Sequence, residues 1–189
     1  MILRDELEDD VNRIVYWREY PPYWLDPVNK IKNPDVTDDT FFIMDLKAKK
    51  QKQINQTVSF LDENSEGGIV VAVVPSHDPA TRDSGIRRVA QQLALLERID
   101  GTSCLLRHTQ APKKSGGGSR DKAIDLRTIR VVNPEIIKGR LVLLLDDVTS
   151  TGGSLEACKR LLQNAGAKNV QCLAIGKTVH KCPFPQLMP

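Results

Sequence analysis

Residues 140–167 constrain the fold of this chain more than any other stretch. The apolar run at 141–145 ends in two adjacent acids, Asp146 and Asp147. An apolar run of this length predicts a strand that is buried on both faces of a parallel sheet. Small hydroxyl residues and two glycines follow, and apolar residues then recur at helical spacing until Gly166, where a helix would end. The stretch therefore predicts a strand, a short polar loop and the N-terminus of a helix.

The predicted loop has the composition of a phosphate-binding site. A helix N-terminus presents unpaired N–H groups and a partial positive charge, which favour a bound anion. Glycine lets the backbone approach that anion closely, and hydroxyl groups donate hydrogen bonds without adding charge. The candidate phosphate-binding residues are Thr149, Ser150, Thr151, Gly152, Gly153 and Ser154. No lysine follows the glycines, so the loop does not match the P-loop of nucleoside triphosphatases.

The two acids before this loop predict a second part of the ligand. Adjacent carboxylates at the end of a strand repel each other unless a ligand compensates them. Sugar hydroxyls can donate hydrogen bonds to carboxylates, and a divalent cation also suits their oxygens. Asp146 and Asp147 therefore predict a cis-diol next to the phosphate, as in a ribose 5-phosphate. The alternative is an ordinary strand, turn and helix with an acidic pair that arose by chance.

The motif LLLDDVTSTGGSL at 143–155 closely resembles the signature of the type I phosphoribosyltransferases, which bind phosphoribosyl pyrophosphate (PRPP). The resemblance implies that Asp146 and Asp147 meet the ribose hydroxyls as catalytic residues and that 149–154 wrap the 5-phosphate. It implies a transfer of the phosphoribosyl group to a nitrogen acceptor, with release of pyrophosphate. Mg²⁺ is the implied cofactor, held mainly by the oxygens of PRPP rather than by protein ligands.

Other apolar segments predict the rest of the sheet. A second apolar run at 69–74 predicts a central strand, and an amphipathic helix follows it. Further strands are predicted at 103–107 and 170–175. This alternation predicts an α/β fold with a doubly wound, mostly parallel sheet. The resemblance implies the type I phosphoribosyltransferase fold, with a small hood built from the terminal segments.

The loop after the 69–74 strand is the expected pyrophosphate site. Ligands of such sheets lie beyond the carboxyl ends of the strands, so this loop is expected close to the acid pair. The resemblance assigns pyrophosphate binding to Pro75, Ser76 and His77. For His77 the alternative is a loop residue that caps the next helix.

The segment at 108–125 is long, polar, basic and rich in glycine. Such a segment in a compact domain is usually functional or disordered. The resemblance implies a mobile loop that closes over PRPP and excludes water. The residues expected to neutralise the departing pyrophosphate are Arg107, Lys113, Lys114 and Arg120. A plain flexible linker is the alternative.

Residues 1–65 form an expected N-terminal hood or partner segment, and 66–189 the phosphoribosyltransferase core. Both tryptophans and all three tyrosines lie within 16–24, which predicts a cluster packed on the sheet, a base-stacking surface or a partner site. A short apolar strand is predicted at 40–44. The lysine-rich run after it is either a solvated helix face or a phosphate-binding surface.

Composition bears on nucleic-acid binding, membrane insertion, cellular location and zinc binding. The net charge is only +3, so it does not indicate nucleic-acid binding, and no apolar stretch approaches the length of a membrane span. A cytoplasmic protein is expected. The four cysteines form no C-x-x-C pair, so no zinc site is expected.

Within the family, the order of motifs between 69 and 178 most resembles the ComF-like phosphoribosyltransferases. Ser150 stands where 6-oxopurine enzymes carry an acid, which disfavours hypoxanthine or guanine as the acceptor. The acceptor base stays undefined. The alternative function is a non-catalytic regulator or adaptor that senses PRPP or a ribonucleotide and is linked to DNA or RNA processing. A homodimer, and a protein or nucleic-acid partner for the N-terminal segment, are further options that the sequence leaves open.

Overall fold

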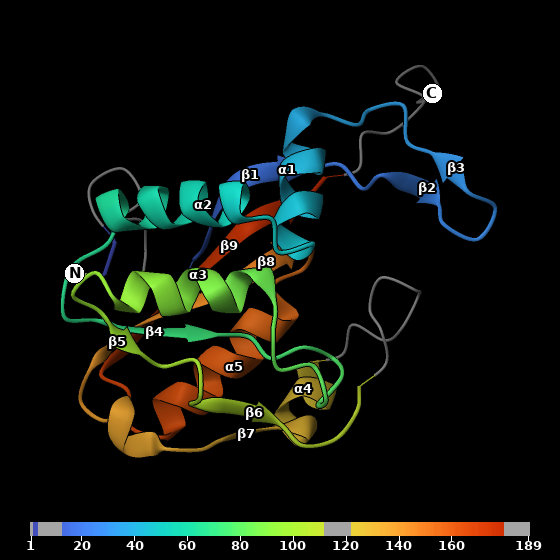
Figure 1. Cartoon of the computed structure of the whole chain (residues 1–189). Helices are drawn as coiled ribbons and strands as arrows, with labels where there is room; N and C mark the ends of the chain where they lie inside the picture. Colours follow the sequence, from blue (N-terminus) through green and yellow to red (C-terminus); the bar gives the residue numbers. More distant parts are fainter. Residues whose placement is uncertain (1, 4–12, 112–121, 180–189) are drawn as a thin grey trace, which may run out of the picture.

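The computed structural model describes residues 2–3, 13–111 and 122–179. Its centre is a five-stranded sheet in the order β1-β9-β8-β4-β5 (Figure 1). The strands are β1 (Ile14–Tyr20), β4 (Val70–Val73), β5 (Ile99–Asp100), β8 (Leu141–Thr149) and β9 (Asn169–Thr178). Every pair of neighbouring strands is parallel, which confirms the predicted α/β fold.

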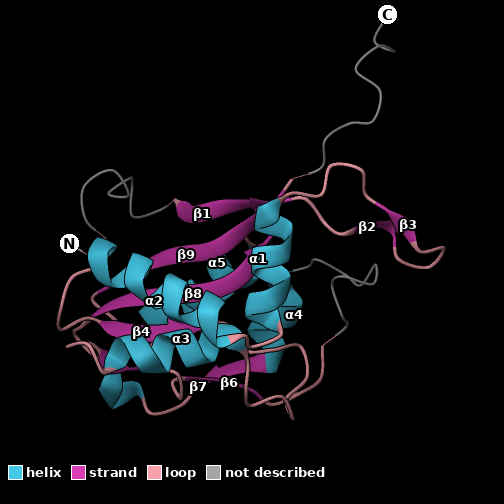
Figure 2. Cartoon of the chain, turned by 45° about the horizontal axis from the view of Figure 1, so that its top comes forward, coloured by secondary structure: helices cyan, strands magenta, loops and turns pink. Residues whose placement is uncertain are grey.

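Helices cover both faces of this sheet (Figure 2). The helices of one layer are α1 (Asp38–Lys47), α2 (Gln51–Asn64) and α3 (Gly85–Ala94). The opposite face is covered by α5 (Gly153–Asn164), with α4 (Lys122–Thr128) packed beside it. The doubly wound arrangement is therefore confirmed. Among the described residues, no helix combines the length and the apolar character that a membrane span requires.

Strand β8 contributes to both hydrophobic layers. Leu143 and Leu145 belong to the cluster with α1, α2 and α3, whereas Val142 and Leu144 belong to the cluster with α5. All four side chains are fully buried. Successive side chains of a strand point to opposite faces, so a strand between two helical layers must be apolar throughout. Burial of each side chain contributes about 1.5–3 kcal/mol.

Several short elements lie outside the main sheet. A hairpin of β2 (Trp24–Asp26) and β3 (Ile31–Lys32) projects from the body (Figure 1). The strand predicted at 103–107 is β6 (Leu105–Arg107), but it pairs with β7 (Ile129–Val131) in a separate antiparallel ribbon. A turn in which Cys104 donates to the Gly101 carbonyl separates β6 from β5, so β5 takes the edge position in the main sheet. A short 3-10 helix, η3 (Pro134–Ile136), leads back to β8.

The prediction of a strand at 40–44 was wrong, because these residues lie in α1. The N–H of Thr37 donates to the Thr40 hydroxyl, as in a helix capping box. Asp38 and Asp39 occupy the first turn, where negative charge favours a helix. A five-residue apolar run fits a buried helix as well as a strand, and these flanking residues decide in favour of the helix.

The N-terminal segment is part of the same core as the rest of the chain. Strand β1 pairs along its length with β9, and the side chains of α1 and α2 enter the cluster that contains the β8 leucines. The predicted boundary at residue 65 therefore does not separate two packing units. The pairing joins residues more than 150 positions apart, from Ile14 with Cys172 to Tyr20 with Thr178, and local sequence patterns carry no signal for it.

Helices α1 and α3 meet at a contact that only glycine allows. A Cβ atom on Gly85, the first residue of α3, would lie 1.9 Å from the carbonyl oxygen of Leu46. Leu46 is fully buried at the end of α1. The absence of a side chain at Gly85 therefore sets the position of the last turn of α1.

We expect Gly85→Ala to lower the free energy of unfolding by about 1–3 kcal/mol, because the added methyl group forces the two helices apart. This loss should exceed the gain of up to about 1 kcal/mol from the higher helix propensity of alanine. Urea denaturation of Gly67→Ala provides the control, since a Cβ atom there would meet no atom closer than 3.8 Å. Equal stability of the two variants would contradict the tight α1–α3 contact.

Candidate functional site

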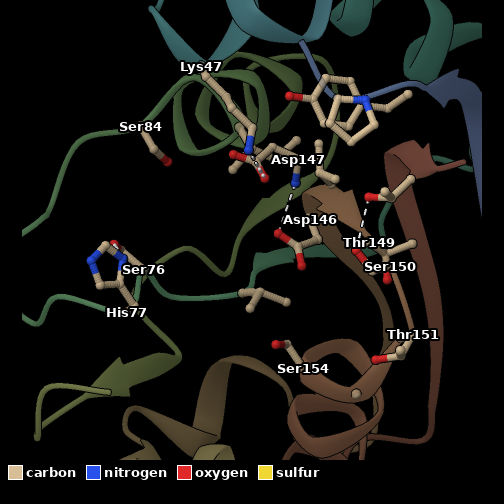
Figure 3. Close-up of a pocket in the computed structure, with 18 of the residues that line it drawn as sticks. Lys47, Ser76, His77, Ser84, Asp146, Asp147, Thr149, Ser150, Thr151 and Ser154 are labelled. Atoms are coloured by element: carbon tan, nitrogen blue, oxygen red, sulfur yellow. Dashed lines mark hydrogen bonds and ion pairs between the residues drawn. The ribbon is translucent and has the colours of Figure 1, made fainter. Parts of the chain in front are cut away.

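A cleft of about 1200 Å³ opens at the carboxyl ends of β4 and β8. Its floor is formed by the loop at 74–77, which follows β4, and by residues 146–154, which run from the end of β8 to the start of α5. The end of α1 and the hairpin of β2 and β3 form further walls. The cleft brings together the acid pair, the candidate phosphate loop and the candidate pyrophosphate loop (Figure 3).

The loop at 149–154 is held against the end of β9. The Ser150 hydroxyl donates to the Thr178 hydroxyl over 2.9 Å, and Lys177 Nζ donates to the Ser150 carbonyl over 2.5 Å. Gly152 is the N-cap of α5 and has a φ of +81°, which favours glycine. A Cβ atom at Gly152 would also lie 2.3 Å from Ile14 Cδ1, so β1 closes the space behind the loop. The loop and the start of α5 thus form a fixed site that suits an anion.

The two acids point in different directions. In Figure 3 the Asp146 carboxylate is directed into the cleft, whereas the Asp147 carboxylate is directed toward Lys47. Lys47 Nζ lies 3.5 Å from Asp147 Oδ1, and the backbone N–H of Asp147 donates to Asp146 Oδ1 over 2.9 Å. Alternation along β8 is the reason, since consecutive side chains of a strand face opposite sides. Only one of the adjacent acids therefore faces α1.

The charge of Lys47 is stabilised by its surroundings. Partial burial acts to lower the pKa of this ammonium, but the Asp147 carboxylate, the Tyr20 hydroxyl and the Asp146 carboxylate outweigh it and raise the pKa above 10.5. Lys47 is therefore a cation at neutral pH. It belongs to the lysine run noted in the sequence, although composition alone did not separate it from its neighbours.

The loop at 75–77 lies across the cleft from Thr151 and Ser154 (Figure 3). The Val74 N–H donates to the Leu145 carbonyl, which ties the start of this loop to β8. His77 does not cap the next helix, because the N-cap of α3 is Ser84, whose hydroxyl accepts from the Arg87 N–H. The alternative role considered for His77 is therefore wrong, and its ring lines the cleft.

Arg107 lines the cleft, and its guanidinium binds groups of the protein itself; its expected contact with pyrophosphate stays a prediction. Its NH2 group lies 2.9 Å from Asp125 Oδ1, and the two side chains are 3% and 0% exposed. Its Nε donates to the Ser76 carbonyl and its NH1 to the Thr128 hydroxyl. Since all three nitrogens have partners, Arg107 is placed to hold the loop at 75–77 in position.

The segment expected to close over the ligand is described only at its two ends. Lys113, Lys114 and Arg120 lie outside the described residues. At its first end, the His108 N–H donates to the Thr128 carbonyl and the Ala111 N–H donates to the His77 carbonyl. The segment therefore leaves the fold beside the candidate pyrophosphate loop.

The aromatic stretch near the N-terminus divides between the core and the cleft. Trp17 stacks on Phe60 with ring centroids 4.0 Å apart and packs against the core. Tyr20 packs against the same core and also lines the cleft, together with Tyr23 and Trp24. Trp24 is 40% exposed and contacts the Tyr23 ring edge to face. The packed cluster is thus confirmed for Trp17, whereas the base-stacking surface stays a prediction for the residues at the cleft.

Within the described part of the chain, no group of three or more histidine, cysteine, aspartate or glutamate side chains could hold a metal ion. Cys104, Cys158 and Cys172 are buried free thiols. Burial raises the pKa of Cys104 to about 11 and that of Cys172 to about 12, so both stay protonated. These three cysteines pack as small apolar residues.

Comparison with known families places the site in a recognised domain. The family described as phosphoribosyl transferase domain matches residues 86–181, slightly more than half of the chain. The matched segment contains the acid pair and the loop at 149–154. Three parts of the cleft lie outside the match: Lys47, the loop at 75–77 and the aromatic wall, which is formed by Tyr20, Tyr23 and Trp24.

Two curated relatives match over short segments. Adenine phosphoribosyltransferase from Treponema denticola is 37% identical over 59 residues, which cover 31% of each chain. Ribose-phosphate pyrophosphokinase from Thermoplasma acidophilum is 40% identical over 55 residues, which cover 29% of this chain and 19% of the relative. The matches thus span about a third and a fifth of the lengths of these relatives.

Solved structures give alignments that are longer but lower in identity. Adenine phosphoribosyltransferase from Leishmania donovani aligns with 88% of this chain and 82% of its own, at 13% identity and a TM-score of 0.44. Phosphoribosylpyrophosphate synthetase from Mycobacterium smegmatis aligns with 72% of this chain and 35% of its own, at 24% identity and a TM-score of 0.37.

We expect Asp125→Asn to lower the free energy of unfolding by about 3–5 kcal/mol, because it leaves the Arg107 charge buried without its counter-ion. Chemical denaturation measures the loss. Asp83→Asn is the control, since Asp83 pairs with Lys49 and Arg88 at the surface, where ion pairs contribute little. A loss no larger than that of the control would show that Arg107 does not depend on Asp125.

The raised pKa of Lys47 predicts a stability difference that depends on pH. The ion pair stabilises the folded state fully below the unfolded value of 10.5, and this contribution disappears as the pH rises through the folded pKa. The difference in free energy of unfolding between wild type and Lys47→Met should therefore shrink as the pH rises above 10.5. A difference that stays constant over this range would mean that the charge of Lys47 does not stabilise the fold.

Proposed function

The chain belongs to the phosphoribosyl transferase domain family, and on this premise we propose that it binds Mg–PRPP in the cleft. It transfers the phosphoribosyl group to a nitrogen acceptor and releases pyrophosphate. The observation that carries the proposal is the joint position of three groups in one cleft: the N-terminus of α5, the acid pair and the loop at 75–77. The N-terminus of α5 suits a phosphate, the acid pair suits a diol, and the loop at 75–77 suits a pyrophosphate.

Each part of the cleft has a separate role in this proposal. The backbone and hydroxyls of 149–154 bind the 5-phosphate, and Asp146 and Asp147 accept hydrogen bonds from the ribose hydroxyls. The backbone at 75–77 binds the pyrophosphate, and Arg107 positions this loop. The bond from C1 to the pyrophosphate oxygen breaks as the bond from the acceptor nitrogen to C1 forms. The carboxylates also stabilise the positive charge that develops on the ribose ring in the transition state.

The magnesium ion of this proposal enters with the ligand. We expect the oxygens of PRPP to supply most of its ligands, because Mg²⁺ prefers oxygen ligands and usually binds through substrate phosphates. When bound, Mg²⁺ offsets the charge of the pyrophosphate as it departs.

The aromatic wall indicates the kind of acceptor. Tyr20, Tyr23 and Trp24 line the cleft together with Met44, and aromatic side chains favour stacking on a planar base. Ser150 cannot exchange a proton with a purine near neutral pH, so hypoxanthine and guanine are poor candidates. From the order of its motifs we propose that the chain belongs to the ComF-like branch of the family.

Calorimetry of Mg–PRPP binding, combined with an assay of pyrophosphate release against a panel of nitrogen bases, tests the function. Asp146→Asn and Asp147→Asn should each weaken binding about 10- to 100-fold, the range for loss of a hydrogen bond to a charged group. Asp83→Asn, which changes an acid outside the cleft, should bind like wild type.

The outcomes separate the two candidate functions. Base-dependent release of pyrophosphate by the wild type would support the enzyme and identify its acceptor. Binding without release would favour a regulator or adaptor that senses PRPP or a nucleotide. Wild-type protein that does not bind Mg–PRPP would overturn the proposal.

A further inference from the structure

Lys47 extends from the end of α1 into the cleft, toward one acid of the pair (Figure 3). Its ammonium lies 3.5 Å from Asp147 Oδ1, and its side chain is 44% exposed. The other lysines nearby bind elsewhere: Lys49 pairs with Asp83 and Lys50 with Asp45. Neither of these two lysines lines the cleft. Of these three lysines, Lys47 alone is directed at the candidate ribose site.

The backbone of Lys47 is held in place by packing on two sides. Leu46 contacts α3 at Gly85, where a Cβ atom would collide with the Leu46 carbonyl. Ile43, one turn earlier in α1, packs on Gly176 of β9, where an added Cβ atom would lie 3.1 Å from Ile43 Cδ1. Both Leu46 and Ile43 are fully buried. The ammonium therefore extends from a fixed point of the fold.

The positive charge of Lys47 offsets electrostatic repulsion that the acid pair creates in the cleft. Asp146 and Asp147 are adjacent, and the ligand proposed for the cleft carries a phosphate and a pyrophosphate. Carboxylates close to these anions repel them as well as each other. A cation beside Asp147 offsets one of these negative charges and also limits the positions that its carboxylate can adopt.

We propose that Lys47 is a positioning residue of the ribose site, which acts through Asp147 on the binding of the diol. This inference rests on the proposed function, since it assigns a role within the same cleft. It makes the two acids unequal: Asp147 depends on α1 for its orientation, whereas Asp146, on the other face of β8, is directed into the cleft.

Three substitutions test this role by calorimetry. Lys47→Met should weaken the binding of Mg–PRPP about tenfold, and Lys47→Arg, which keeps the charge, should restore most of the affinity. Lys49→Met is the matched control, because it removes a lysine that pairs with an acid outside the cleft. Thermal unfolding of each variant confirms that it is folded before binding is measured.

Two further measurements separate positioning from a general effect on the fold. Ribose 5-phosphate and 2-deoxyribose 5-phosphate differ only in the hydroxyl at C2, so Lys47→Met should weaken the first ligand more than the second. In a double-mutant cycle, Lys47→Met should change affinity little once Asp147→Asn is present, because the two residues act as a unit. A purely structural role would give additive losses and equal effects on both sugars.

The results also separate this inference from the proposed function. If wild-type protein binds Mg–PRPP and Lys47→Met binds it equally well, the role of Lys47 is overturned and the function stands. Additive losses in the cycle would likewise overturn it. If wild-type protein does not bind Mg–PRPP, the proposed function falls and the role of Lys47 falls with it.

Discussion

The site depends on the alternation of side chains along β8. Four leucine and valine side chains of this strand fill the two hydrophobic layers in turn, so the orientation of the strand is set by its buried part. The same alternation continues into Asp146 and Asp147 and directs them apart. A slip of one residue would exchange the surroundings of the two acids. Packing of the core thus decides the geometry of the polar site at its edge.

The N-terminal segment contributes to the site because it is part of the core. Pairing of β1 with β9 brings α1 over the sheet, and the close contact at Gly85 sets where α1 ends. Lys47 reaches Asp147 from this position, and the chain before α1 supplies the aromatic wall. The family match covers the acid pair and the loop at 149–154, while the walls outside it come from residues 20–47 and from the loop at 75–77. The aromatic side chains proposed to contact the acceptor thus lie in the N-terminal part.

A buried ion pair between β6 and α4 supports the loop at 75–77. Arg107 ends β6 and Asp125 lies in α4, and Arg107 joins this pair to the loop at 75–77 by donating to the Ser76 carbonyl. Removing both charges from water costs free energy, so the main contribution of this pair is to fix the geometry of the groups that it joins. It holds the candidate pyrophosphate loop at a set distance from the segment that leaves β6. An arginine in the sequence next to a basic loop carries no sign of this internal role.

The sequence by itself determined the parallel sheet and the candidate phosphate loop. The apolar runs at 69–74 and 141–145, and the hydroxyl and glycine residues after Asp147, act through local chemistry that is visible in the chain. Tertiary structure decided the place of β1, the internal pairing of Arg107 and the contact of Lys47 with Asp147. These features depend on contacts between residues far apart in the chain. Local periodicity cannot reveal them, because it reports which face of an element is apolar and not which element will cover that face.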